Sequence, residues 1–180
     1  YFGRSTTIFG FSYLAQAKDI SIGYGQPLAA DFRENLEDLA ASSDAKFLAT
    51  TLGLSANQVK SPLLSVDQTK INRRLQGDDL QDYSEAVREY VAQIEGDLIF
   101  LEGFSNLWEG SIFNLSVPEV AELIDASILL VARYQPQLLV GSLLSAKKFL
   151  GDRLLGVIIN DVPPEEFSTA SQIIKLYLEN

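Results

Sequence analysis

The strongest constraint on the fold is an alternation of short apolar runs with longer helical patterns. Three runs rich in Leu, Ile and Val, at 97–103, 126–134 and 154–162, have the length and composition of buried parallel strands. A fourth run, at 20–27, is weaker because glycines interrupt it. Helical patterns flank the runs at 4–17, 34–53, 67–77, 81–95, 117–124, 136–150 and 164–179. The alternation predicts an α/β fold with a doubly wound, mainly parallel sheet and helices on both faces.

The length favours a single domain. A chain of 180 residues, 47% of them hydrophobic, can bury one core but is short for two ordinary domains. We therefore expect one domain over residues 1–180, with 53–80 as a possible insertion ahead of the run at 97–103. The opening residues resemble the start of a helix that needs a strand before it, so we also expect an N-terminally truncated fragment of a longer protein.

Composition excludes several kinds of chemistry. The sequence has no cysteine and no histidine, which removes disulfides, thiol nucleophiles, a histidine base and the usual zinc sites. A net charge of −10 argues against a nucleic-acid partner, because phosphate backbones require clustered Lys and Arg. No apolar run reaches the roughly 18 to 20 residues of a membrane span. We expect a cytoplasmic protein that binds neither nucleic acid nor a membrane.

The first residues resemble the second half of a phosphate-binding loop. Such a loop has the pattern G-x-x-x-x-G-K-[ST] where a strand turns into a helix, and "GRSTT" at residues 3–7 would close it with Arg4 in the lysine place. Backbone N–H groups at a helix N-terminus and the hydroxyls of Ser5 and Thr6 suit an anion. A plain N-capped helix would explain the same residues.

Polar residues follow each expected strand. In an open parallel sheet, ligands bind at the carboxyl ends of the strands. Glu102 could ligate Mg²⁺ there or cap a helix, and Asn160 could pair with an adenine edge or simply occupy a turn. For Asp44, the ordinary explanation is that it caps the start of a helix. The residues at the expected strand ends are Gln26, Glu102, Gly103, Arg133, Tyr134, Asn160 and Asp161.

The order of these short motifs resembles a known family. "GRSTT", "GQP" (25–27), "SSDA" (42–45), "LEG" (101–103) and "INDVPP" (159–164) resemble the dethiobiotin synthetase-like (BioD-like) branch of P-loop proteins, whose fold the cobyrinic acid amide synthases share. The stretches "IGYGQPLA", "EGSIFNLS", "DASILLVARYQ" and "LLSAKKFLGDRLLGVIIND" resemble the N-terminal domain of cyanobacterial phosphotransacetylase-family proteins, in which a DRTGG domain follows.

This resemblance implies an ATP site with Mg²⁺. The metal ligands would be Ser5, Asp44 and Glu102. The nucleotide would be bound by Gly3, Arg4, Ser5, Thr6, Gln26, Asn160 and Pro163, with Asn160 reading adenine and Pro163 shaping the base pocket. The family has a lysine at the positions of Arg4 and Gln26, and phosphoryl transfer needs cations there, so we expect little or no dethiobiotin synthesis.

Three functions remain open at this level. The first is a regulatory or sensory domain whose Mg²⁺-ATP occupancy alters the C-terminal remainder of a longer protein. The second is a degenerate scaffold, with apolar helices that mediate homo-oligomer contacts. The third is an ATP-dependent ligase or amide synthase of the dethiobiotin or cobyrinate type.

Overall fold

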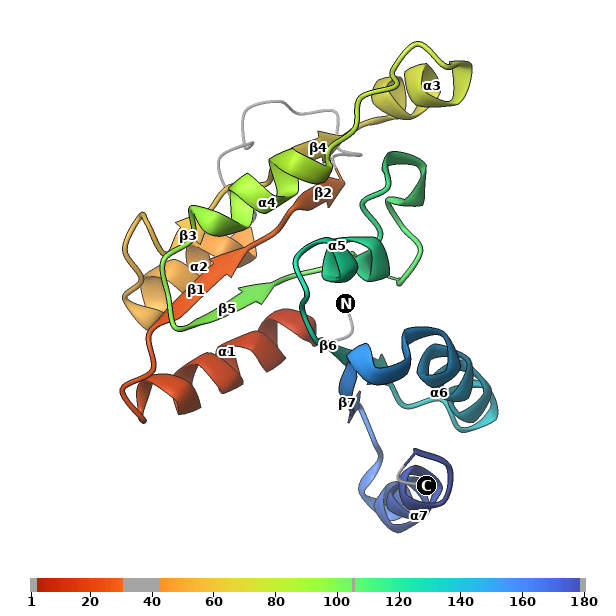
Figure 1. Ribbon diagram of the computed structural model, residues 1–180. Coiled ribbons are helices and arrows are strands. Elements are labelled where there is room, and N and C mark those ends of the chain that lie inside the picture. Colours follow the sequence, from red (N-terminus) through yellow and green to blue (C-terminus); the bar gives the residue numbers. More distant parts are fainter. Residues whose placement is uncertain (1–2, 31–42, 105, 179–180) are drawn as a thin grey trace. The chain divides into compact units, whose positions relative to one another are not determined.

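The protein consists of parallel strands flanked by helices (Figure 1). The computed structural model describes residues 3–30, 43–104 and 106–178. The chain divides into two compact units, one spanning Arg4–Asp125 and the other made of Tyr1–Gly3 with Ala126–Asn180. The expectation of a single domain therefore stays a prediction.

A three-stranded parallel sheet organises the larger unit. Its central strand is β1 (Ile22–Gly25), which pairs with β3 (Val59–Lys60) on one side and with β5 (Leu98–Leu101) on the other. Tyr24 lies opposite Val59 on one neighbour and Phe100 on the other. The weak run at 20–27 is thus the central strand of this sheet.

Two further strands continue from this sheet, and the sequence patterns did not predict them. β2 (Leu28–Ala30) follows β1, β4 (Leu64–Val66) follows β3, and the two pair in parallel. A proline lies in each junction, Pro27 and Pro62. Proline has no N–H for the ladder, so each junction breaks the regular pairing. The stretch 53–80 supplies β3, β4 and the helix α3 (Gln68–Gln76).

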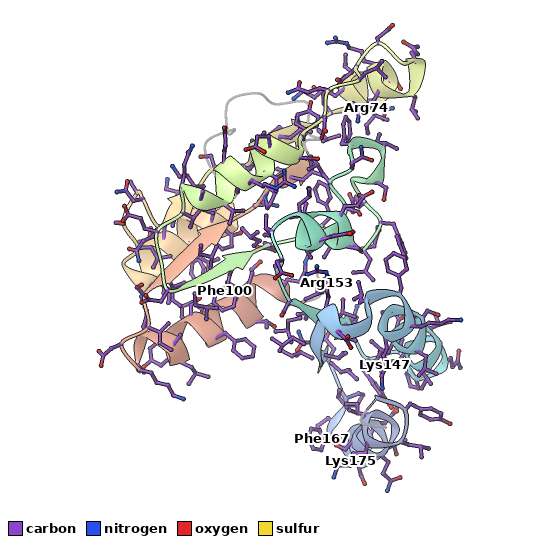
Figure 2. The ribbon with its side chains drawn as sticks, in the orientation of Figure 1. Arg74, Phe100, Lys147, Arg153, Phe167 and Lys175 are labelled. Carbon is purple, nitrogen blue, oxygen red and sulfur yellow. The ribbon has the colours of Figure 1, made fainter. Side chains whose placement is uncertain are left out.

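Helices cover both faces of β1, as predicted. On one face Tyr24 packs with residues of α1 (Arg4–Gln16) and α2 (Ser43–Leu52), and Figure 2 labels Phe100, which packs against the same cluster. On the other face the strand carries Gly23 and Gly25. A Cβ at either glycine would lie within 3.0 Å of Ile94 side-chain atoms. The missing Cβ atoms therefore allow α4 (Ser84–Ala92) and the turn after it to approach the sheet closely.

A second core cluster in the same unit connects β2 and β4 to α4, α5 and the loop before α5. Val87 and Phe113 are almost wholly inaccessible to solvent within it. A capping box between Ser116 and Glu119 starts α5 (Val117–Leu123), as the Ser-Val-Pro-Glu pattern indicates. The 3-10 turn Ser111–Phe113 presents Phe113 to this core.

The other unit contains its own parallel pair of strands. β6 (Ile128–Arg133) and β7 (Leu154–Asn160) pair along their length, with Arg133 opposite Asn160 at the end. α6 (Pro136–Leu150) and α7 (Phe167–Leu178) flank the pair, and 3-10 turns occupy Gly151–Arg153 and Pro164–Glu166. One core cluster of this unit contains Tyr134, Leu139, Leu143 and Ala170.

The α/β class with mainly parallel strands is confirmed. The runs predicted as strands correspond to β1, β5, β6 and β7, and the predicted helices correspond to α1 through α7. Only the part of the predicted helix 34–53 from residue 43 onward lies within the described residues, where it is α2.

Candidate functional site

The carboxyl ends of β1 and β5 place Glu102 beside the start of α1. The backbone N–H of Glu102 donates to the carbonyl of Gly25 over 2.9 Å, so the pairing of the two strands extends one residue beyond β5. The side chain of Glu102 is only 7% exposed. A carboxylate with so little access to water requires partners inside the protein.

Tyr24 supplies one of these partners. Its hydroxyl donates a hydrogen bond of 2.8 Å to Glu102 Oε2, and the residue is 1% exposed. The two residues lie on neighbouring strands, and Tyr24 is held by packing against Ala45 and Leu48 of α2. The alternation along β1 points this ring toward α1 and α2, because the glycines on either side of it face α4.

The first residues of α1 engage the other carboxylate oxygen. Ser5 Oγ donates to Glu102 Oε1 over 3.3 Å, and Arg4 Nε lies 3.8 Å from the same oxygen. Arg4 Nη1 also donates to the carbonyl of Gly103 over 2.6 Å. Arg4, Ser5, Tyr24 and Glu102 therefore form one connected polar group, which we call the Glu102 cluster.

Three predicted site residues thus meet in this cluster. Arg4 and Ser5 precede Glu102 by nearly one hundred residues in the sequence. Thr6 is exposed at the same helix start. Asp44 belongs to α2, but its side chain lies outside the described residues, so its role as a metal ligand stays a prediction.

Gln26 is positioned through a second tyrosine. Its backbone N–H donates to the hydroxyl of Tyr90 over 2.9 Å, and this hydroxyl lies 3.2 Å from the carbonyl of Lys60, to which it donates. Burial raises the pKa of Tyr90 to about 12. Tyr90 therefore joins the ends of β1 and β3 from the α4 face, whereas Tyr24 acts from the opposite face.

The smaller unit brings together two other predicted residues. Asn160 ends β7, and a Cβ built on Gly3 would overlap its side-chain amide. Gly3 also has a φ of +77°, which only glycine adopts readily. The positive φ is the reason for glycine at this position, and the missing Cβ also lets the Asn160 amide lie close to the backbone.

The remaining strand-end residues of this unit have polar partners within the unit. Arg133 Nε lies 3.0 Å from Asp161 Oδ2, with both side chains exposed, and the Tyr134 hydroxyl donates to Glu166 Oε2 over 2.7 Å. That hydrogen bond raises the pKa of Tyr134. Pro163 is partly buried just before the 3-10 turn Pro164–Glu166. Whether Asn160 and Pro163 bind a base stays a prediction.

The donor set of the Glu102 cluster fits Mg²⁺ in kind. Carboxylate and hydroxyl oxygens are the ligands this ion prefers, and it usually takes one or two carboxylates and completes its shell with phosphate oxygens and water. Across 3–30, 43–104 and 106–178, no group of three or more acidic, His or Cys side chains could hold a metal ion. The carboxylate of Glu102 and the hydroxyl of Ser5 would by themselves supply only part of a coordination shell.

The sequence predictions missed both tyrosines. Tyr24 and Tyr90 carry no motif, and each reads as an ordinary aromatic residue in a strand or helix. The alternation of Tyr24 with Gly23 and Gly25 is the one signal that could have placed its ring on the face opposite the glycines.

One known protein family matches almost the whole chain. The family match supports a nucleotide-binding P-loop domain. The profile of the AAA domain family matches residues 3–178, and the chain belongs to that family. Within the described part of the chain, no helix combines the length and apolar character needed to cross a membrane.

Proposed function

We propose that this chain is a regulatory domain that binds Mg²⁺-ATP and turns it over slowly or not at all. The observation that carries the proposal is the Glu102 cluster, in which a buried carboxylate meets the arginine and serine at the start of α1. Membership of the AAA domain family supports a nucleotide as the ligand. When bound, Mg²⁺ would neutralise phosphate charge, with Ser5 and Glu102 as its protein ligands.

Low turnover follows from the residue types at the two positions where the resembled family has lysine. Gln26 has no charge, and its backbone N–H is engaged by Tyr90. Arg4 retains a charge but is already paired with Glu102 and Gly103. Phosphoryl transfer depends on cations placed around the transferring group. Binding energy would then serve to select a conformation rather than to lower a chemical barrier.

The resemblance to phosphotransacetylase-family proteins supports a regulatory role for this binding. We propose that occupancy alters an adjoining C-terminal region of a longer protein, and that Asn160 and Pro163 contribute selectivity for adenine. The amide of asparagine can donate to and accept from the adenine edge at once. Loss of discrimination between ATP and GTP in Asn160→Ala would support the second point, and unchanged discrimination would remove Asn160 from the base site.

The direct test is titration calorimetry with ATP, in the presence and absence of Mg²⁺. We expect Mg²⁺-dependent binding that falls at least about tenfold in Glu102→Gln, because this substitution removes the charged ligand and keeps the shape. Glu89→Gln, which changes an exposed glutamate on α4, is the matched control and should bind as the wild type does. Equal affinity of the Glu102 variant and the control would exclude Glu102 from the site.

A scaffold without nucleotide is the second candidate, and one observation favours it. Both oxygens of Glu102 already have protein partners, so the fold does not need a ligand to satisfy this carboxylate. A scaffold predicts no effect of Mg²⁺-ATP on the melting temperature. Any upward shift that requires Mg²⁺ would contradict it, because a ligand that binds only the folded state stabilises that state.

A further inference from the structure

Arg4 is the cation that accompanies Glu102 in this structure. Its Nε atom lies 3.8 Å from Glu102 Oε1, while Nη1 donates to the neighbouring carbonyl of Gly103 over 2.6 Å. The Arg4 side chain is 26% exposed and that of Glu102 is 7% exposed. An ion pair with one buried partner is screened less by solvent than a surface pair.

Two of the residues expected to ligate Mg²⁺, Ser5 and Glu102, are hydrogen-bonded to each other. Ser5 Oγ donates to Glu102 Oε1, and Oε1 is also the oxygen nearest Arg4. Tyr24 occupies Oε2. A dication approaching this carboxylate would meet the repulsion of a guanidinium at close range.

Arginine suits this arrangement better than lysine does. The guanidinium presents five N–H donors in a fixed plane, so Nη1 can hold the Gly103 carbonyl while Nε faces the carboxylate. A lysine has three donors on one nitrogen and lacks this planar arrangement. The same planar group binds phosphate oxygens in a bidentate manner.

We infer that Arg4 has two positions and controls access of Mg²⁺ to Glu102. Without nucleotide it neutralises Glu102 and keeps Mg²⁺ from this carboxylate. With nucleotide its guanidinium binds phosphate, which removes the repelling charge from Glu102 and lets the metal approach this carboxylate and Ser5. This inference rests on the proposed function and adds its regulation: Mg²⁺ and nucleotide bind with strong positive coupling, and Mg²⁺ alone does not bind.

The first experiment titrates MgCl₂ alone, by calorimetry, into the wild type and three variants. We expect no binding at Glu102 in the wild type up to millimolar Mg²⁺. Arg4→Gln should gain at least about tenfold in Mg²⁺ affinity, because the repelling charge is gone while the ligands remain. Adding Glu102→Gln to Arg4→Gln should remove that gain. Arg88→Gln, which changes an exposed arginine on α4, should behave as the wild type does.

Two results of this titration would overturn the inference. One is binding of Mg²⁺ alone to the wild type as tightly as to Arg4→Gln. The other is a folded Arg4→Gln protein with no gain in affinity. If neither the wild type nor any variant binds ATP, the proposed function fails. The titration with MgCl₂ alone still decides whether Arg4 keeps the metal from Glu102.

A second measurement uses the wild type alone and does not depend on a variant that folds. The measurement is the NMR chemical shift of the Arg4 Nε–H group, assigned by through-bond correlation to the Arg4 backbone. This chemical shift changes when the guanidinium changes its partner. We expect this signal to shift on addition of Mg²⁺ with ADP or ATP and to stay in place with MgCl₂ alone. A signal that does not move at saturating nucleotide would overturn the proposed change of position.

Discussion

The hydroxyl of Tyr24 donates a 2.8 Å hydrogen bond to Glu102 Oε2 between two neighbouring strands. Tyr24 is 1% exposed and Glu102 is 7% exposed, so water has little access to this pair. The acid at the end of β5 is therefore oriented by a side chain that packing already immobilises. A group held in this way can present its other oxygen to Ser5 and Arg4 in a fixed direction.

Tyr24→Phe should lower the free energy of unfolding by about 1 to 3 kcal/mol, because it leaves one oxygen of a buried carboxylate without its donor. Urea denaturation followed by circular dichroism measures the change. Tyr13→Phe, at a tyrosine that is 63% exposed on α1, is the control and should differ from the wild type by less than about 0.5 kcal/mol. Equal effects of the two substitutions would show that water replaces the Tyr24 hydroxyl without cost.

Two glycine substitutions should change stability in opposite directions. A Cβ at Gly23 would lie 2.5 Å from Ile94 Cγ2 and 2.8 Å from the Glu95 carbonyl oxygen, so Gly23→Ala should cost about 1 to 3 kcal/mol of stability. A Cβ at Gly10 meets no atom within 4 Å, so Gly10→Ala in the interior of α1 should stabilise the protein by about 0.5 to 1 kcal/mol. Thermal unfolding of both variants tests the pair, and a stabilising Gly23→Ala would contradict the close packing of α4.

Ionisation of Tyr90 should lower the free energy of unfolding in strong base. Its pKa is about 12 when folded, against a usual value of about 10, so the folded state retains the proton between these pH values while the unfolded chain releases it. Stability from this group is complete below pH 10 and declines as the pH rises toward 12. A shift of about two units corresponds to roughly 2 to 3 kcal/mol at the upper end.

Tyr90→Phe isolates this contribution. The pKa values of Tyr83 and Tyr134 are also raised, so the wild type has other sources of decline in base. Urea unfolding at several pH values from 8 to 11 should show a shallower decline for Tyr90→Phe, along with a constant loss from the unpaired Gln26 N–H. Parallel curves for the variant and the wild type would mean that Tyr90 titrates normally.

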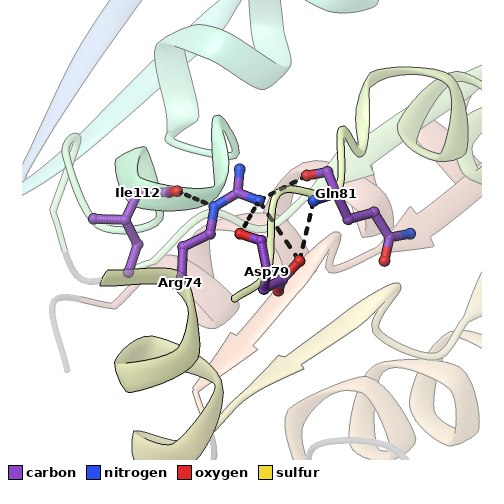
Figure 3. A network of polar contacts seen from close by, with 4 residues as sticks. All are labelled: Arg74, Asp79, Gln81 and Ile112. Carbon is purple, nitrogen blue, oxygen red and sulfur yellow. Dashed lines mark hydrogen bonds and ion pairs between the residues drawn. The ribbon is translucent and has the colours of Figure 1, made fainter. Parts of the chain in front are cut away.

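Arg74 connects the end of α3 by hydrogen bonds to the loop at 79–81 and to the turn at Ile112 (Figure 3). Its Nη1 donates to the carbonyls of Asp79 and Gln81, its Nε donates to the carbonyl of Ile112 over 2.7 Å, and its guanidinium lies 5.5 Å from the ring centroid of Phe113. Arg74→Lys keeps the charge but loses this planar set of donors, and should cost about 1 to 3 kcal/mol. Arg73→Lys, one residue earlier and exposed, should change stability by less than about 0.5 kcal/mol in the same denaturation assay.

Sequence patterns alone predicted the α/β class and most of the regular elements. The apolar runs became β5, β6 and β7, and the helix signal at Ser116 marks the start of α5. These features depend on local periodicity and on capping, which neighbouring residues determine. The short strands β2, β3 and β4 were not predicted. Segments of two or three residues are too short to show an alternation of apolar and polar residues, and they form only where a partner strand lies alongside.

For the candidate site, the sequence determined which residues have the right chemistry, and tertiary structure decided which of them meet. "GRSTT" and "LEG" identified Arg4, Ser5 and Glu102 as separate candidates. Only the parallel pairing of β1 with β5 and the packing of α1 beside them bring these groups into contact and add Tyr24. The pairing of Arg4 with Glu102 was also invisible in the sequence, because the attraction between two charges depends on their separation in space and on the burial around them.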